Sequence, residues 1–330
     1  MSSQFVDYIK ILGKGRNGSR SLTEQEAEDA MSLILEHQVA PEQMGAFWML
    51  IRIREETVEE AAGFTRAIRK LIAKQHQISI KVDLDWPAYA GKRNELPWFL
   101  LAAFALSQSG IKTVMHGHSF DEDARIYVDS IINWLELPIM KSLQEAEEQL
   151  HNHNFAYIPL GVISPELSDL MNLKRLLGLR SPVNTVVRMM NPMGATHSVH
   201  GVFHTSYDEL HIETAKLLKD QSVLVFRGGN GEAEVNPERD VSLGLLKDQD
   251  VTWSQCPKAS SQHIRQKDNL DFTRLVRHWT GERMDEFGEL AVIQTMAAVL
   301  GMVTDESNAT RNLEYAHRIW KARNTQKMLG

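Results

Sequence analysis

The hydrophobic pattern of this chain changes after residue 75, and this change limits the possible folds. Before it, apolar residues recur at helical spacing, and Thr23 and Thr57 each stand three residues before a glutamate, as in a capping box. Pro41 suits the first position of another helix. We therefore expect a small helical domain over residues 1–75. Its expected helices are residues 5–12, 23 to about 37, a helix that starts at 41, and 57 to about 74.

Beyond residue 75, short apolar stretches alternate with helical stretches. Strands joined by helices imply a mainly parallel sheet with helices on both faces. The sequence therefore predicts a larger α/β domain over residues 76–330, ending in a basic helical tail. The expected strands are residues 78–82, 113–115, 155–159 and 222–226, and the expected helices are 98–108, 121–134 and 165–177.

Composition excludes several classes of protein. The 330 residues carry a formal net charge of -7, so an anionic partner such as nucleic acid needs a local basic patch. Cys256 is the only cysteine, which rules out intrachain disulfides and cysteine-cluster metal sites and indicates a reducing compartment. The longest apolar run, residues 98–106, is about half of the ~20 residues that a membrane span needs. We find no signal-peptide pattern and expect a soluble cytoplasmic protein.

A set of motifs along the chain points to one family. They are the pattern of residues 22–70, His116-Gly117, the segment 177–181, Val183-Asn184 with Asn191-Pro192, and the segment 228–234. In this order and at this spacing they resemble the anthranilate phosphoribosyltransferase family of glycosyltransferase family 3. The resemblance implies a nucleoside phosphorylase/phosphoribosyltransferase type of fold, in which the helical domain is hinged to the α/β domain. It also implies a homodimer formed through the helical domains and a cleft for phosphoribosyl diphosphate.

The positions that match the family's catalytic motifs carry other residues. The family's Gly-Thr-Gly-Gly-Asp-Gly diphosphate turn falls on residues 87–92, where only Gly91 remains and Pro87 has no N–H to donate. The acceptor-binding arginine falls on Lys174, and the Asp-Glu pair that holds Mg²⁺ falls on Ala233 and Glu234. No catalytic set is intact, and Glu234 would be a vestigial metal ligand. The vestigial substrate cleft comprises Tyr89, Gly91, Gly117, Asn184 and Gly231.

Basic residues stand at or beside these altered positions, a pattern that resembles the YbiB-type branch of the family. That branch has lost the transferase residues and binds single- or double-stranded nucleic acid without clear sequence preference. We therefore expect a catalytically silent homodimer that binds nucleic acid through a basic groove, with no membrane and no cofactor. Mg²⁺ would be needed only if transferase activity survives. The expected contacts to nucleic acid or phosphate are Lys92, Arg93, His116, His118, Lys174, Arg175, Arg180, Arg188 and Arg227.

Other interpretations of the sequence stay open. One is a phosphoribosyltransferase with a divergent site for anthranilate or a related acceptor, and another is a dimeric interaction scaffold. The glycines of residues 13–18 match a dinucleotide-binding pattern, but a helix precedes them, so we favour a loop whose Lys14, Arg16 and Arg20 could contact phosphate. The paired histidines could bind a metal ion, but we favour the interpretation that they are ordinary surface residues. The turn at 227–231 could cradle phosphate or simply end a strand, and Trp86 and Tyr89 are candidate stacking platforms.

Overall fold

Capping boxes begin two of the helices in the N-terminal domain. The Thr23 hydroxyl accepts from the Glu26 N–H at 3.2 Å while the Glu26 carboxylate accepts from the Thr23 N–H at 2.9 Å. Thr57 and Glu60 repeat this arrangement. The helical predictions are confirmed. The helices are α1 (Ser3–Gly13), α2 (Glu24–Leu35), α3 (Pro41–Arg54) and α4 (Val58–Gln75).

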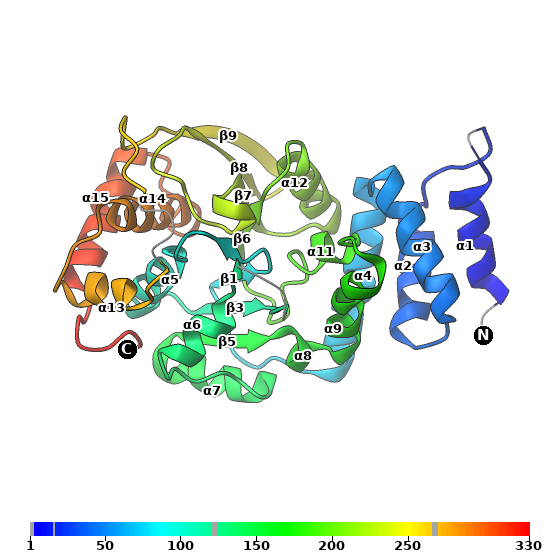
Figure 1. The fold of residues 1–330 in the computed structure, drawn as a ribbon, viewed down its shortest axis with the longest axis horizontal. Coiled ribbons are helices and arrows are strands. Elements are labelled where there is room, and N and C mark those ends of the chain that lie inside the picture. The colour runs from blue at the N-terminus through cyan, green and yellow to red at the C-terminus, as the bar shows by residue number, and fades with distance from the viewer. Residues whose placement is uncertain (1–2, 16, 121–124, 266–269) are drawn as a thin grey trace.

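The computed structural model describes residues 3–15, 17–120, 125–265 and 270–330, and places the helical domain beside a larger α/β domain (Figure 1). The central sheet of this domain has the strand order β5-β3-β1-β6-β7-β8-β9. The strands from β5 to β7 are parallel, as predicted, whereas β8 and β9 add an antiparallel edge that the sequence did not reveal. The strands are β1 (Leu84–Ala88), β3 (Thr113–Gly117), β5 (Phe155–Pro159), β6 (His197–Val202), β7 (Ser222–Arg227), β8 (Val241–Lys247) and β9 (Asp250–Cys256).

Helices cover both faces of the sheet, and a two-stranded ribbon lies apart from it. The ribbon pairs β2 (Lys92–Arg93) with β4 (Arg125–Ile126). The helices are α5 (Phe99–Gln108), α6 (Val128–Trp134), α7 (Leu143–His153), α8 (Leu160–Ile163), α9 (Pro165–Asn172), α10 (Lys174–Leu177), α11 (Val183–Val186), α12 (Tyr207–Leu218), α13 (Thr273–Thr280), α14 (Glu286–Val303) and α15 (Ala309–Ala322), with the 3₁₀ turn η1 (Gly229–Gly231).

Alternate residues of β3 and of β7 face separate cores. Met115 of β3 packs with α5, α14 and α15, whereas its neighbour Val114 packs with the helical domain and α7–α9. In β7, Leu224 and Val223 divide in the same way, with Val223 packing against α12. Because both faces of these strands are buried, they lack the apolar–polar alternation of a strand with one face in water.

This two-sided burial explains the main error in the predicted elements. The alternating segment 78–82 is not a strand, and β1 lies immediately after it with all five of its residues buried. The predicted helix 165–177 is divided at Leu173 into α9 and α10. The predicted helix 121–134 is observed from Val128, and residues 121–124 lie outside the described residues.

The apolar composition of α14 follows from its position in the fold. By length and hydropathy alone this helix could cross a membrane, but 67% of it is buried inside the α/β domain. It packs against α5 and α15 in the core on one face of the sheet. This is the environment of a core helix in a globular protein.

Polar contacts join the helical domain to the α/β domain. Arg69 of α4 donates to Asp220 at 2.9 Å and to the Met189 carbonyl at 2.6 Å. The Thr185 hydroxyl donates to Glu56, which follows α3, at 2.6 Å. Both carboxylates lie on the opposite side of the domain boundary from their donors, so these contacts orient one domain against the other.

Helices α2 and α4 approach closely at Gly63. A Cβ atom built on Gly63 would lie 2.3 Å from the Glu24 carbonyl oxygen and 2.7 Å from the Ala27 Cβ. We expect Gly63→Ala to lower the free energy of unfolding by about 1–3 kcal/mol, because the two helices must move apart. A Cβ atom built on Gly45 of α3 would have no atom within 4 Å, so Gly45→Ala should raise the free energy of unfolding by about 0.5–1 kcal/mol. Urea unfolding of both variants measures these changes; an equal effect of the two would contradict the close approach.

Candidate anion-binding site

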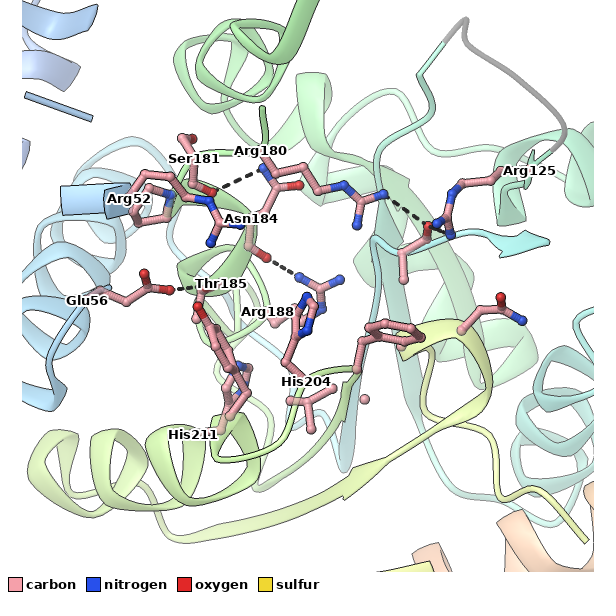
Figure 2. Close-up of a pocket in the computed structure, with 18 residues that line it drawn as sticks. Arg52, Glu56, Arg125, Arg180, Ser181, Asn184, Thr185, Arg188, His204 and His211 are labelled. Atoms are coloured by element: carbon pink, nitrogen blue, oxygen red, sulfur yellow. Dashed lines mark hydrogen bonds between the residues drawn. The ribbon is translucent and has the colours of Figure 1, made fainter. Parts of the chain in front are cut away.

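A pocket of about 310 Å³ lies between the helical domain and the carboxyl ends of β1 and β6, and we call it the first arginine pocket. Its charged lining consists of four arginines and one carboxylate, that of Glu56. Figure 2 shows that Arg125, Arg180 and Arg188 point toward the same space from different segments of the α/β domain. The fourth arginine, Arg52, comes from α3 of the helical domain. The pocket therefore has walls from both domains.

Three of these arginines donate to backbone carbonyls. Arg125 donates to the Ala90 and Gly91 carbonyl oxygens at 3.0 and 2.9 Å, and Arg180 contacts the Ala90 oxygen at 3.5 Å. Arg188 donates to the Asn184 carbonyl (Figure 2). Within the described residues, Arg125, Arg180 and Arg188 form no ion pair with a carboxylate. The carboxylate of Glu232 acts on Arg125 and Arg188 through its charge, but it forms no ion pair with either.

The pKa values of these side chains reflect this arrangement. Burial lowers the pKa of Arg188 to about 10, with Arg180 adding to the decrease and Glu232 opposing it. Burial also lowers the pKa of Arg125, and the neighbouring Arg180 and Arg93 act in the same direction. Both guanidinium groups remain charged at neutral pH, in a setting that disfavours positive charge.

A second pocket of about 300 Å³, the second arginine pocket, is lined by Arg227, Arg239 and Arg265 together with Glu95 and Asp240. Arg265 pairs with Glu95. Arg227 donates to the Thr205 hydroxyl and Arg239 donates to the Arg227 carbonyl oxygen, both at 3.3 Å. Phe203 and Asn230 line both pockets, so the two are neighbours.

The loop after β1 is held by an internal carboxylate. Oε1 of Glu232, a buried residue, accepts from the N–H groups of Ala90 and Gly91 at 2.8 and 2.6 Å. Gly91 has a φ of 68°, which favours glycine, and a Cβ there would clash with the Tyr127 ring. Two adjacent N–H groups aimed at one oxygen form the kind of turn that binds a phosphate oxygen. Here a side chain of the same protein occupies it.

A buried ammonium group lies beside this loop. Lys92 is fully buried, and its Nζ is 2.6 Å from Glu234 Oε1 and 2.9 Å from Glu95 Oε2. Glu234 also accepts from the Phe99 N–H at 2.9 Å, at the start of α5. Burial alone would lower the pKa of Lys92, but the carboxylates of Glu234 and Glu95 outweigh it and raise that pKa. Lys92 is therefore a structural cation inside the domain.

Comparison with known proteins shows which proteins this chain resembles. Residues 6–72 match the helical bundle domain of the glycosyl transferase family. An anthranilate phosphoribosyltransferase of Geobacillus stearothermophilus is 25% identical over 73% of this chain and 70% of its own length. The uncharacterized protein YbiB of Escherichia coli is 24% identical over 73% of this chain and 77% of its own length.

Solved structures agree over nearly the whole chain. Anthranilate phosphoribosyltransferase from Thermus thermophilus superposes with a TM-score of 0.78 over 97% of this chain and 94% of its own, at 18% identity. The enzyme from Saccharomyces cerevisiae in complex with PRPP and Mg gives 0.80 over 99% and 96%, at 13% identity. The chain thus resembles the anthranilate phosphoribosyltransferases of glycosyltransferase family 3 and shares their fold. The family resemblance and the fold class predicted from the sequence are confirmed.

The structure corrects several site residues predicted from the family motifs. Lys92 and His116 are fully buried, so neither presents a surface to nucleic acid. The His116 ring lies between Asp85 Oδ1, at 2.9 Å, and the Tyr89 hydroxyl, at 2.7 Å. Trp86 and Tyr89 are fully buried and form no stacking platform. All these residues follow or belong to β1 and β3, and their side chains lie inside the domain.

The other predicted residues are divided between the pockets and separate positions. Arg180, Arg188, Asn184 and Gly231 line the first arginine pocket, and Arg227 lines the second. Arg93 is exposed and pairs in register with Arg125 of β4, at the edge of the first pocket. Four other predicted residues line neither pocket. The Nζ atom of Lys174 lies 4.9 Å from the centre of the Phe120 ring, and Arg175 is exposed. His118 contacts Asn172, and Gly117 packs against Ala88. Arg16 lies outside the described residues.

Sequence reasoning missed Arg52, Arg125, Arg239 and Phe203. Arg52 stands in the last turn of α3, where a basic residue is ordinary on account of the helix dipole. Arg125, Arg239 and Phe203 belong to none of the family motifs. Arg125 is placed by the pairing of β4 with β2, a contact that local patterns do not reveal.

The residues that correspond to the family's Mg²⁺ site do not fit a metal ion. Glu234 is bound to Lys92 and to the Phe99 N–H, and Ala233 offers no side-chain oxygen. In the described part of the chain, no group of three or more His, Cys, Asp or Glu side chains is placed to hold a metal. His200 is buried rather than on the surface, where we expected the paired histidines.

Removing the Lys92 charge should destabilise the fold. Lys92→Met leaves the buried Glu234 carboxylate without an ion-pair partner and leaves Glu95 with Arg265 alone, and we expect the free energy of unfolding to fall by about 3–5 kcal/mol. Lys92→Met combined with Glu234→Leu should recover much of the loss, because the main unpaired charge is removed. The matched control Arg93→Met, at the exposed neighbouring position, should change it by less than about 0.5 kcal/mol. Urea unfolding tests this, and equal values for Lys92→Met and Arg93→Met would contradict a structural role for Lys92.

Two buried histidines beside the first arginine pocket predict acid sensitivity. The Nδ1 atoms of His200 and His211 are 3.3 Å apart, and burial lowers the pKa of His200 from 6.5 to about 4 and that of His211 as well. The unfolded chain thus binds more protons below about pH 6.5, so stability is complete above that pH and is lost as the pH falls toward about 4, by up to ~1.4 kcal/mol per pH unit for each histidine. Urea unfolding across this range should show a smaller fall for His211→Gln; an identical fall would count against the histidine pair.

Proposed function

We propose that this protein binds nucleic acid electrostatically through the two arginine pockets and does not transfer phosphoribosyl groups. The observation that carries the proposal is the convergence of Arg125, Arg180 and Arg188 on one space with only backbone carbonyls as acceptors. Guanidinium groups brought together in a partly dry pocket repel each other, and a bound anion relieves that repulsion. Phosphate suits arginine particularly well, because its oxygens accept from the planar guanidinium in pairs.

Two adjacent arginine pockets fit a polyanion better than a single small anion. Phe203 and Asn230 are shared by the pockets, with Arg180 and Arg188 on one side and Arg227 and Arg239 on the other. Successive phosphates of one strand would meet these arginines in turn. Because such contacts fall on the backbone rather than on base edges, we propose binding to single- or double-stranded nucleic acid without clear sequence preference.

The loop after β1 supports the absence of transferase activity. In this protein Glu232 already accepts from the Ala90 and Gly91 N–H groups, where the family turn holds diphosphate. Lys92 already supplies the positive charge between Glu95 and Glu234, where the family holds Mg²⁺. A diphosphate would have to displace a buried carboxylate, and a metal would have to displace a buried ammonium group.

The assembly and location that we propose follow the family. We place the protein in the cytoplasm as a homodimer formed through the helical domains. Val6 of α1 and Ile53 of α3 are exposed apolar side chains on that domain and support a contact between copies there.

Charge reversal in both pockets should weaken nucleic-acid binding. We expect Arg180→Glu combined with Arg227→Glu to lower the affinity for a short duplex about tenfold or more, and to reduce the slope of log K against log salt by about 1.8, since each lost phosphate contact contributes about 0.9. Fluorescence anisotropy at several salt concentrations measures both quantities. Arg311→Glu combined with Lys321→Glu, on α15 at the end of the molecule far from the helical domain (Figure 1), is a control with the same charge change.

The proposal has clear contrary outcomes. If the pocket variant and the α15 variant lose the same affinity for the duplex, the loss reflects net charge and not the pockets. If the affinity of the native protein does not change with salt concentration, binding is not electrostatic. Turnover of phosphoribosyl diphosphate and anthranilate with Mg²⁺ at ordinary enzyme rates would overturn catalytic silence. Dimerisation without nucleic-acid binding and without phosphoribosyl transfer would favour the dimeric interaction scaffold instead.

A further inference from the structure

Phe203 is the most exposed large aromatic side chain in the described part of the molecule. It is 65% exposed and stands one residue after the end of β6. The other exposed aromatic side chains there, Trp134, Trp253 and Tyr315, are between 36% and 45% exposed. Leaving an aromatic ring in water forgoes a substantial hydrophobic gain, so such a ring is a candidate contact for a partner.

The backbone at Phe203 lies close to the turn η1. A Cβ atom on Gly231 would lie 3.2 Å from the Phe203 Cβ, so these two segments are in close contact. Gly231 has a φ of 90°, which a residue with a side chain rarely adopts. The ring of His204 meets the Phe203 ring edge-on, with centroids 5.1 Å apart and an interplanar angle of 89°. No aromatic ring of the described residues stacks in parallel on Phe203.

Arginines lie on both sides of this ring. Phe203 lines the first arginine pocket with Arg180 and Arg188, and lines the second with Arg227 and Arg239. An aromatic platform inside a positively charged groove is the arrangement by which proteins hold single strands, because bases stack on the ring while cations follow the backbone. A duplex offers no open base face except at its ends, since each base is stacked on its neighbours.

We propose that Phe203 stacks on one unpaired base of a single-stranded nucleic acid whose flanking phosphates are bound by the two arginine pockets. The inference rests on the proposed nucleic-acid binding and adds the form of the ligand. Stacking reads only the face of the base, so deoxyribose and ribose strands share the chemistry that this site recognises. The site selects strands with an accessible base over continuous duplex.

The experiment compares Phe203→Leu, which keeps apolar bulk but removes the aromatic face, with Phe203→Trp, which restores it. Binding is measured by anisotropy with oligothymidylate and oligouridylate of about 12 nucleotides, a length typical of single-strand sites, and with a blunt duplex of equal length. A second strand carries 2-aminopurine, whose fluorescence is quenched when the base stacks. Tyr315→Leu on α15 is the matched control, and the melting temperature of each variant reports folding.

We expect Phe203→Leu to lower the affinity for both single strands about tenfold, to change duplex affinity less than about twofold and to leave the salt slope unaltered. Phe203→Trp should restore single-strand affinity and 2-aminopurine quenching. Equal binding of single strands by the native protein and Phe203→Leu, with a steep salt dependence in both, would overturn the stacking role while nucleic-acid binding stands. Equal losses for single strand and duplex would overturn it too, as would Phe203-dependent capture of a protein without single-strand binding. Absence of any salt-dependent binding by the native protein would remove both proposals.

Discussion

The architecture of the site depends on buried charges that the protein supplies to itself. Glu232 receives two backbone N–H groups from the loop after β1, and Lys92 joins Glu95 and Glu234 beside it. Each charge is out of water and would be costly alone, but each has partners within hydrogen-bond distance. These contacts fix the loop whose Ala90 and Gly91 carbonyls then accept from Arg125. The arginine pockets are therefore positioned by an ion network of which Glu95 lines the second pocket, whereas Lys92, Glu232 and Glu234 line neither.

The helical domain was predictable because its signals are local. Capping boxes at Thr23 and Thr57 specify where helices start, and the residues involved lie within one turn of each other. The position of β1 was not predictable in the same way, because all five of its residues are buried although Asp85 is polar and Pro87 is a residue that sequence patterns exclude from central strands. The antiparallel addition of β8 and β9 depends on pairing with β7, which no short pattern in the sequence specifies.

The residues of the candidate site show the same difference between what local patterns specify and what long-range contacts decide. Arg180, Arg188 and Asn184, which family spacing assigned to the cleft, line one pocket, since the framework that positions them is common to the fold. Family spacing placed Lys92 there wrongly, because the partner Glu234 is 142 residues away and removes the lysine from the surface. Charge alone does not tell a ligand contact from a buried counter-ion. Phe203 had no signal, because exposure is a property of the folded surface.

The contacts of Arg69 and Thr185 across the domain boundary have a consequence for recognition. Arg52 and Glu56 line the first arginine pocket from the helical side, and the remaining lining belongs to the α/β side. The width of the opening is thus set by the angle between domains, which the Arg69–Asp220 and Thr185–Glu56 pairs hold. A ligand in this pocket contacts both domains at once and forms a third link between them. Affinity at this site and the equilibrium between domain orientations are consequently linked, so a change in either alters the other.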